Sequence, residues 1–71
     1  MERSFYQFAL KYRGKLVEDD FSRFADAMFL DHSFPRSSDN FELLSRYIEE
    51  KAHPILKASA FDSMWEEYEG L

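Results

Sequence analysis

Two histidines, His32 and His53, are the side chains best suited to acid–base chemistry, because the charge of imidazole changes near neutral pH. A nucleophilic triad would place one of them beside a serine or cysteine and a carboxylate. The chain contains no cysteine, and neither histidine is accompanied by a G-x-S-x-G sequence. We therefore predict no catalytic residue, no cofactor and no small-molecule substrate, and we expect that the protein is not an enzyme.

Paired ligands are the nearest that the sequence comes to a metal site. Asp19-Asp20 and Asp31-His32 each offer two ligands, whereas a bound metal needs three or four that converge. Neither an EF-hand loop nor an H-x-x-x-H face is present. Asp19 and Asp20 are explained more simply as helix caps, so we predict no metal ligand.

Three cations, Arg13, Lys15 and Arg36, form the candidate interaction patch. Phosphate binding by this patch would make the protein nucleic-acid-associated, but a net charge of −5 disfavours that alternative. Lys15 and Arg36 fall in predicted loops. Arg13 lies on the apolar side of its predicted helix, so we expect its guanidinium to bond to a carboxylate such as Asp20 or Asp31.

Charge is unevenly distributed along the chain. Residues 1–15 hold four basic side chains and one acidic one, a net charge of +3, whereas residues 59–71 hold four acids and no base, a net −4. One interpretation is that the first and fourth helices are neighbours whose ends attract. The other is a surface for self-association or for a protein partner. Such a surface would also need an apolar anchor, because exposed ion pairs contribute only ~0–1 kcal/mol each.

The spacing of apolar residues predicts four helices and no strand, since they recur at i, i+3, i+4 and i+7 and nowhere alternate over the length of a strand. We expect helices over about residues 5–13 and 20–31, a third that ends near residue 51, and a fourth after residue 59. Short helices of this kind suit two crossed helical hairpins better than a long parallel bundle. The expected caps are, in chain order, Ser4, Asp19 or Asp20, Asp39 or Ser38, and Ser59.

These helices are expected to form a single domain over residues 1–71, with the segment 21–35 at its centre. A chain this short buries only about 60% of its unfolded surface, so bulky aromatic side chains should fill the core. Phe34 should point inward, and Leu30, which lies off the main apolar stripe, should cover the following loop. The predicted core residues are Phe5, Phe8, Phe24, Met28, Phe29, Leu44, Ile48, Phe61 and Trp65.

A set of aromatic and capping residues also resembles the YozE-like family of small bacterial proteins. The matching residues are Ser4-Phe5-Tyr6-x-Phe8, Arg13, Phe24-Ala25, Phe29-x-Asp31, Phe34-Pro35, Ser38-x-Asn40-Phe41, Ser45-x-Tyr47 and Phe61-Asp62-x-x-Trp65-x-x-Tyr68. The resemblance covers nearly the whole chain and implies an all-α, SAM-like bundle of two roughly orthogonal hairpins. It implies no activity, because the family has no established function, cofactor or catalytic residue to transfer.

We therefore expect a non-catalytic interaction or adaptor module whose partner is another protein or a second copy of the chain, with a nucleic-acid-associated protein as the alternative. No apolar run approaches the ~20 residues of a membrane span. The N-terminal residues also lack the basic-then-apolar pattern of a secretory signal. These features predict a cytoplasmic location and no membrane partner.

Overall fold

The computed structural model describes residues 3–14 and 19–70, and over this part of the chain it contains helices and no strand. In chain order they are α1 (Phe5–Ala9), which continues into a 3-10 turn, η1 (Leu10–Tyr12), then α2 (Asp20–Leu30), α3 (Phe41–Lys51) and α4 (Ala58–Glu69). The predicted all-α fold is confirmed. None of the helices described is long and apolar enough to cross a lipid bilayer.

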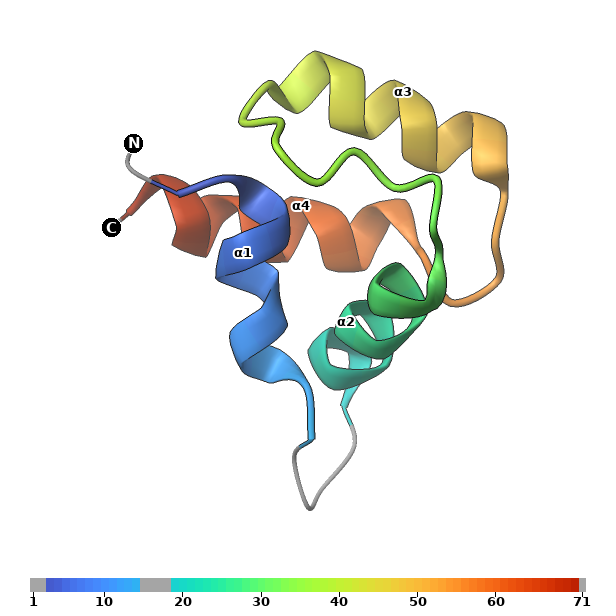
Figure 1. The fold of residues 1–71 in the computed structure, drawn as a ribbon, viewed down its shortest axis with the longest axis horizontal. Coiled ribbons are helices and arrows are strands. Elements are labelled where there is room, and N and C mark those ends of the chain that lie inside the picture. The colour runs from blue at the N-terminus through green and yellow to red at the C-terminus, as the bar shows by residue number, and fades with distance from the viewer. Residues whose placement is uncertain (1–2, 15–18, 71) are drawn as a thin grey trace.

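The helices form two hairpins that lie across one another (Figure 1). The first hairpin joins α1 and η1 to α2, and the second joins α3 to α4. Helix α4 packs against α1, α2 and α3, so it is the central element of the fold. The expectation that the segment 21–35 occupies the centre was wrong. α2 packs mainly against η1 and α4, whereas α4 packs against all three other α-helices.

The helix caps agree with the sequence in the first half of the chain. Ser4 caps α1 in a capping box, in which its hydroxyl accepts the backbone N–H of Gln7 and the Gln7 side chain accepts the N–H of Ser4. Asp19 caps α2 by accepting the N–H of Ser22 at 2.8 Å. Gly14, just after η1, has a φ of 73°, the left-handed geometry that glycine adopts without strain.

The caps of the second half were predicted wrongly by one or two residues. Asn40, and neither Asp39 nor Ser38, caps α3 by accepting the N–H of Leu43. The hydroxyl of Ser38 instead accepts the N–H of Asn40, so it orders the turn before the helix. Helix α4 begins at Ala58 after an N-cap Lys57 that makes no side-chain cap bond, which places Ser59 inside the first turn.

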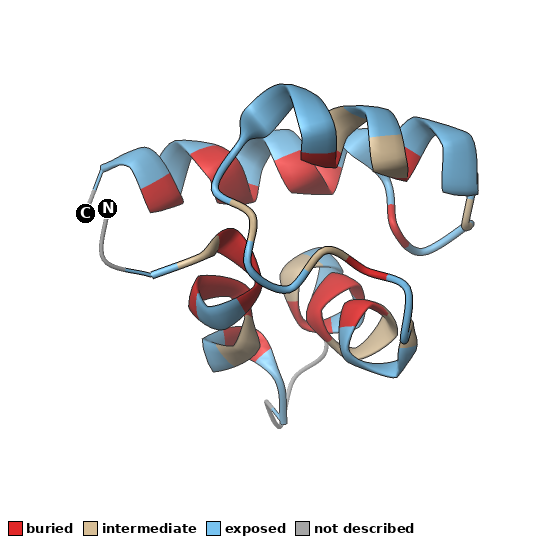
Figure 2. Cartoon of the chain, turned by 45° about the horizontal axis from the view of Figure 1, so that its top comes forward, coloured by how far each residue is buried: buried red, intermediate tan, exposed pale blue. Residues whose placement is uncertain are grey.

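The buried residues lie where the two hairpins meet (Figure 2). Many of them are aromatic. Phe5 stands at their centre, within 5.1–6.3 Å, ring centre to ring centre, of five other aromatic rings from α1, α2 and α4. Eight of the nine predicted core residues are buried. Phe34, which was predicted to point inward, is also buried. Buried residues that the prediction omitted include Tyr6, Tyr12, Leu56, Met64 and Tyr68.

Phe29 is the predicted core residue that the structure places outside, with 40% of its surface exposed. It follows Met28, which is fully buried, and so stands about 100° further round α2, at the edge of the apolar stripe. Its ring instead lies under the guanidinium of Arg13, 3.7 Å from the ring centre. This cation–π contact stabilises the Phe29 ring, which is not buried in the core.

The first and fourth helices are neighbours, as one interpretation of the charge asymmetry predicted. Two tyrosine hydrogen bonds join these segments: Tyr12 O–H donates to the Glu67 carboxylate, and Tyr68 O–H donates to the carbonyl of Arg3. Burial, the hydrogen bond to Glu67 and the nearby carboxylates raise the pKa of Tyr12 to about 12. This phenol therefore remains a neutral donor at physiological pH.

Candidate functional site

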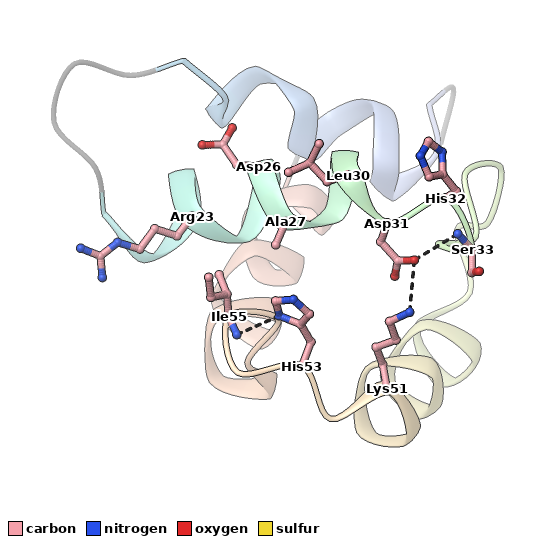
Figure 3. A pocket seen from close by; sticks show the side chains of 10 residues that line it. All are labelled: Arg23, Asp26, Ala27, Leu30, Asp31, His32, Ser33, Lys51, His53 and Ile55. Carbon is pink, nitrogen blue, oxygen red and sulfur yellow. Dashed lines mark hydrogen bonds and ion pairs between the residues drawn. The ribbon is translucent and has the colours of Figure 1, made fainter.

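A depression of the described surface lies between α2 and the connection from α3 to α4, and is called the α2 hollow below (Figure 3). It has a volume of about 690 Å³. Helix α2 and the turn after it form one wall, while the end of α3 and the loop before α4 form the other. The lining residues are Arg23, Asp26, Ala27, Leu30, Asp31, His32, Ser33, Lys51, His53 and Ile55.

Two large aliphatic side chains border the α2 hollow and remain accessible: Leu30, 71% exposed, and Ile55, 41% exposed. Leu30 is the most exposed large apolar side chain among the described residues. It had been expected to cover the loop after α2, but its exposure shows that the loop leaves it open to solvent. Ile55 follows Pro54 and precedes Leu56, which turns inward and is buried, so the neighbouring Ile55 is left outside.

Asp31 forms a polar cluster at one end of the α2 hollow. Its carboxylate accepts the Tyr47 O–H at 2.5 Å, the Ser33 N–H at 3.0 Å and the Lys51 ammonium at 3.4 Å. Burial alone would raise the pKa of this carboxyl, but the hydrogen bonds from Tyr47, Ser33 and Lys51 outweigh it and hold the pKa below its ordinary value. Burial and the bond to Asp31 in turn raise the pKa of Tyr47 to about 12. The cluster is therefore an ionised carboxylate held by neutral and cationic donors.

Arg13 pairs with the other carboxylate of the α2 hollow. Its Nε donates to Asp26 Oδ1 at 3.2 Å while the guanidinium covers the Phe29 ring. The prediction of a carboxylate partner was right, but the choice of Asp20 or Asp31 was wrong. The backbone of Arg13 is extended, with ψ of 152°, so its side chain leaves the helical wheel on which it was placed and runs along the middle of α2.

The two histidines lie on opposite parts of the α2 hollow (Figure 3). His53 Nδ1 accepts the backbone N–H of Ile55 at 3.1 Å, so in the neutral ring the proton sits on Nε2. His32 is exposed in the turn after α2. Among the described residues no three His, Asp or Glu side chains converge as metal ligands would. The predicted absence of a metal site stays a prediction.

The structure describes two of the three residues of the predicted basic patch, Arg13 and Arg36. Lys15 lies outside the described residues. Arg36 is exposed, and its guanidinium lies 5.2 Å from the ring centre of Tyr6, in the first turn of α1. Arg13 follows the far end of η1, about seven residues along the same segment. The two guanidiniums therefore sit at opposite ends of the first helical segment, each over an aromatic ring.

Sequence reasoning missed the α2 hollow as a unit. It noted that Leu30 lies off the apolar stripe, and that was the available signal for an exposed aliphatic residue. The hydrogen bond from Tyr47 to Asp31 joins residues 16 positions apart. Helical periodicity assigns a face to each of them but cannot say which faces meet.

Comparison with known proteins agrees with this architecture. The sequence profile described as the YozE SAM-like fold matches residues 4–70. The chain is 39% identical over 67 residues to YozE of Bacillus subtilis, which covers 94% of this chain and 90% of the relative. It is 40% identical over 68 residues to a Listeria innocua relative, covering 96% and 88%, and 38% identical to one from Geobacillus thermodenitrificans, covering 96% and 94%. The chain belongs to the YozE SAM-like family of bacterial proteins.

Proposed function

We propose that this protein is a non-catalytic, cytoplasmic interaction module that binds another protein through the α2 hollow. The observation that carries the proposal is the pairing of Leu30 and Ile55, two exposed aliphatic side chains, across one depression. Single exposed apolar residues are ordinary, but apolar residues gathered at a depression are typical of binding sites. A side chain from a partner would cover both and remove them from water.

The two carboxylates and His53 in the α2 hollow have structural partners, which supports binding in preference to chemistry. Asp31 is held by three donors, Asp26 accepts from Arg13, and His53 Nδ1 accepts a backbone N–H. A general base must be able to take a proton from a substrate. A carboxylate whose pKa is held low by its neighbours is a weak base for that purpose.

Nucleic-acid association is the alternative, and it rests on Arg13, Lys15 and Arg36. The positions of Arg13 and Arg36 at opposite ends of the first helical segment favour it less than a single cluster would. The net charge of −5 also opposes attraction to a phosphate backbone.

Affinity purification of the tagged protein from its native bacterium, with and without nuclease, separates the two functions. We expect a stoichiometric protein partner that survives nuclease treatment. Partners that disappear with nuclease would overturn the proposal in favour of the alternative. In a mobility-shift assay with DNA and RNA at physiological salt we expect no shift. A salt-dependent shift that Lys15→Glu with Arg36→Glu abolishes would identify the basic patch as the binding surface.

A further inference from the structure

The loop between α3 and α4 is held by a hydrogen bond to a histidine side chain. Ala52 ends α3 with a left-handed backbone, at a φ of 51°. In the turn that follows, His53 Nδ1 accepts the backbone N–H of Ile55 at 3.1 Å (Figure 3). The carbonyl of Ile55 accepts the N–H of Lys57 at 2.9 Å. The N–H of Ile55 therefore depends on an imidazole, a group whose charge changes near neutral pH.

The hydrogen bond from Ile55 requires the neutral form of His53. In a neutral imidazole one ring nitrogen accepts and the other donates, whereas both nitrogens are donors in the cation. Protonation of Nδ1 places an N–H group against the N–H of Ile55. The bond is then lost and the two donors repel each other, so the ring and the amide must move apart.

The charged residues around His53 do not bond to it in the described part of the chain. Both carboxylates of the α2 hollow, Asp26 and Asp31, already accept bonds from other side chains. Among the described residues His53 takes part in no ion pair. The bond to Ile55 is therefore the polar contact that holds the ring. The charged and titratable residues that line the depressions on either side of this loop are Arg23, Asp26, Asp31, His32 and Lys51 in the α2 hollow, and Asp20, Arg23 and Lys57 in a smaller one.

Loss of this bond would affect a short segment and leave the core in place. Leu56, the residue after Ile55, is 2% exposed and belongs to the core cluster, so it anchors the loop before α4. Ile55 is 41% exposed and borders the α2 hollow. Its position is set by its own backbone bonds, one of which is the bond to His53. Movement of residues 53–55 would therefore change the wall of the hollow without unfolding the domain.

We infer that His53 is a pH-sensitive switch for the loop between α3 and α4. Neutral His53 holds Ile55 at the border of the α2 hollow, and protonated His53 releases it, so the shape of the hollow changes between about pH 8 and about pH 5. The inference concerns the free protein and goes beyond the proposed function, since it holds whatever the hollow binds.

NMR spectroscopy of the ¹⁵N-labelled protein from about pH 8 to about pH 5 tests the switch. We expect the neutral His53 ring to carry its proton on Nε2, and the Ile55 amide resonance to follow the protonation of that ring. The protection of the Ile55 amide against exchange with water, corrected for the intrinsic rate, should fall about fivefold or more on acidification. The Leu44 amide, which donates to the Asn40 carbonyl, should keep its protection and serves as an internal control.

Three variants assign the response to His53. In His53→Asn the side-chain carbonyl can accept the N–H two residues ahead and does not titrate, so the Ile55 amide should stay protected across the pH range. In His53→Ala it should be unprotected across the same range. His32→Asn is the matched control, because His32 is the other histidine that lines the α2 hollow, and the response of Ile55 should match the wild type. Circular dichroism checks that each variant is folded.

Four results would overturn the inference. An Ile55 amide whose resonance and protection do not change with pH would show that no switch exists, and a neutral His53 ring protonated on Nδ1 would remove its acceptor. A pH response that persists in His53→Asn would assign it to another group, and a response lost in His32→Asn would assign it to His32. None of these results depends on a partner, so the proposed function is tested separately.

Discussion

The two sides of α2 are held in different ways. On the inner side, Phe24, Ala25 and Met28 are fully buried, and the ring of Phe24 packs against rings from α1 and α4. On the outer side, Asp26 and Asp31 are fixed by hydrogen bonds, and Leu30 is left open. The difference separates stability from recognition on a single helix. Substitutions on the inner side should unfold the protein, and those on the outer side should alter binding or pH response.

The largest effect is expected for Phe24→Ala. Its ring packs edge-on against Phe5 at 6.3 Å and stacks with Phe61 at 6.4 Å. Loss of a buried phenylalanine costs ~3–5 kcal/mol, which is comparable to the whole stability of a domain this small. Urea unfolding followed by circular dichroism measures the loss. Phe29→Ala, the same substitution on the exposed edge of α2, is the control and should cost about 1 kcal/mol. Equal losses of stability in the two variants would contradict the difference between the inner and outer sides of α2.

Asp31→Asn should have the next largest effect, about 1–3 kcal/mol, because it removes a charge that receives three hydrogen bonds. Urea unfolding at neutral pH measures this loss. Tyr47→Phe, which removes one of the donors and leaves the charge, should cost less. If Asp31→Asn leaves the free energy of unfolding unchanged, the three hydrogen bonds to Asp31 do not stabilise the fold. The difference in stability between the inner and outer sides of α2 would then be larger than expected.

The same carboxylate gives the protein a predictable acid response. Its pKa in the folded state is lowered from the ordinary value of 3.8. The stabilisation is therefore present above that value and is lost as the pH falls through the lower, folded-state pKa. Thermal melts across this range should show a smaller loss of stability in Asp31→Asn than in the wild type. An acid response that Asp31→Asn leaves unchanged would assign it to other carboxylates.

Arg13→Ala should cost about 1 kcal/mol, because both members of its ion pair with Asp26 are about two-fifths exposed and solvent screens the attraction. Part of the loss is the stacking of the guanidinium on Phe29. Arg13→Lys separates the two contributions, since lysine keeps the charge without the planar stacking group. A melting temperature unchanged in Arg13→Ala would make Arg13 a surface residue and return it to the candidate patch.

Leu30→Gln should have the smallest effect on folding, within about 0.5 kcal/mol of the wild type, because its side chain is 71% exposed. The measurement is a urea titration run alongside capture of the proposed protein partner. A folded variant that no longer captures the partner would sharpen the contrast between the two sides of α2. A clear loss of stability would show that Leu30 supports the loop after α2.

The sequence was sufficient to predict the four helices, since their apolar stripes are regular and eight of nine core residues follow from them. Its failures have local causes. Phe29 stands at the edge of a stripe, where a neighbouring arginine decides whether the ring is covered. Asn40 was overlooked as a cap because Asp39 and Ser38 beside it have equal capping propensity. The α2 hollow depends on which helices pair, and periodicity within one helix carries no information about that.

The central place of α4 affects how the protein is made. Among the four helices, α4 is the last to be synthesised, yet α1, α2 and α3 each pack against it. α1 is a five-residue helix, and isolated helices shorter than ~12–15 residues are marginal in water. A nascent chain that ends before residue 58 therefore carries Phe5, Phe24 and Leu44 without their common partner, and these apolar side chains remain available to chaperones. Folding of this domain must wait until α4 has left the ribosome.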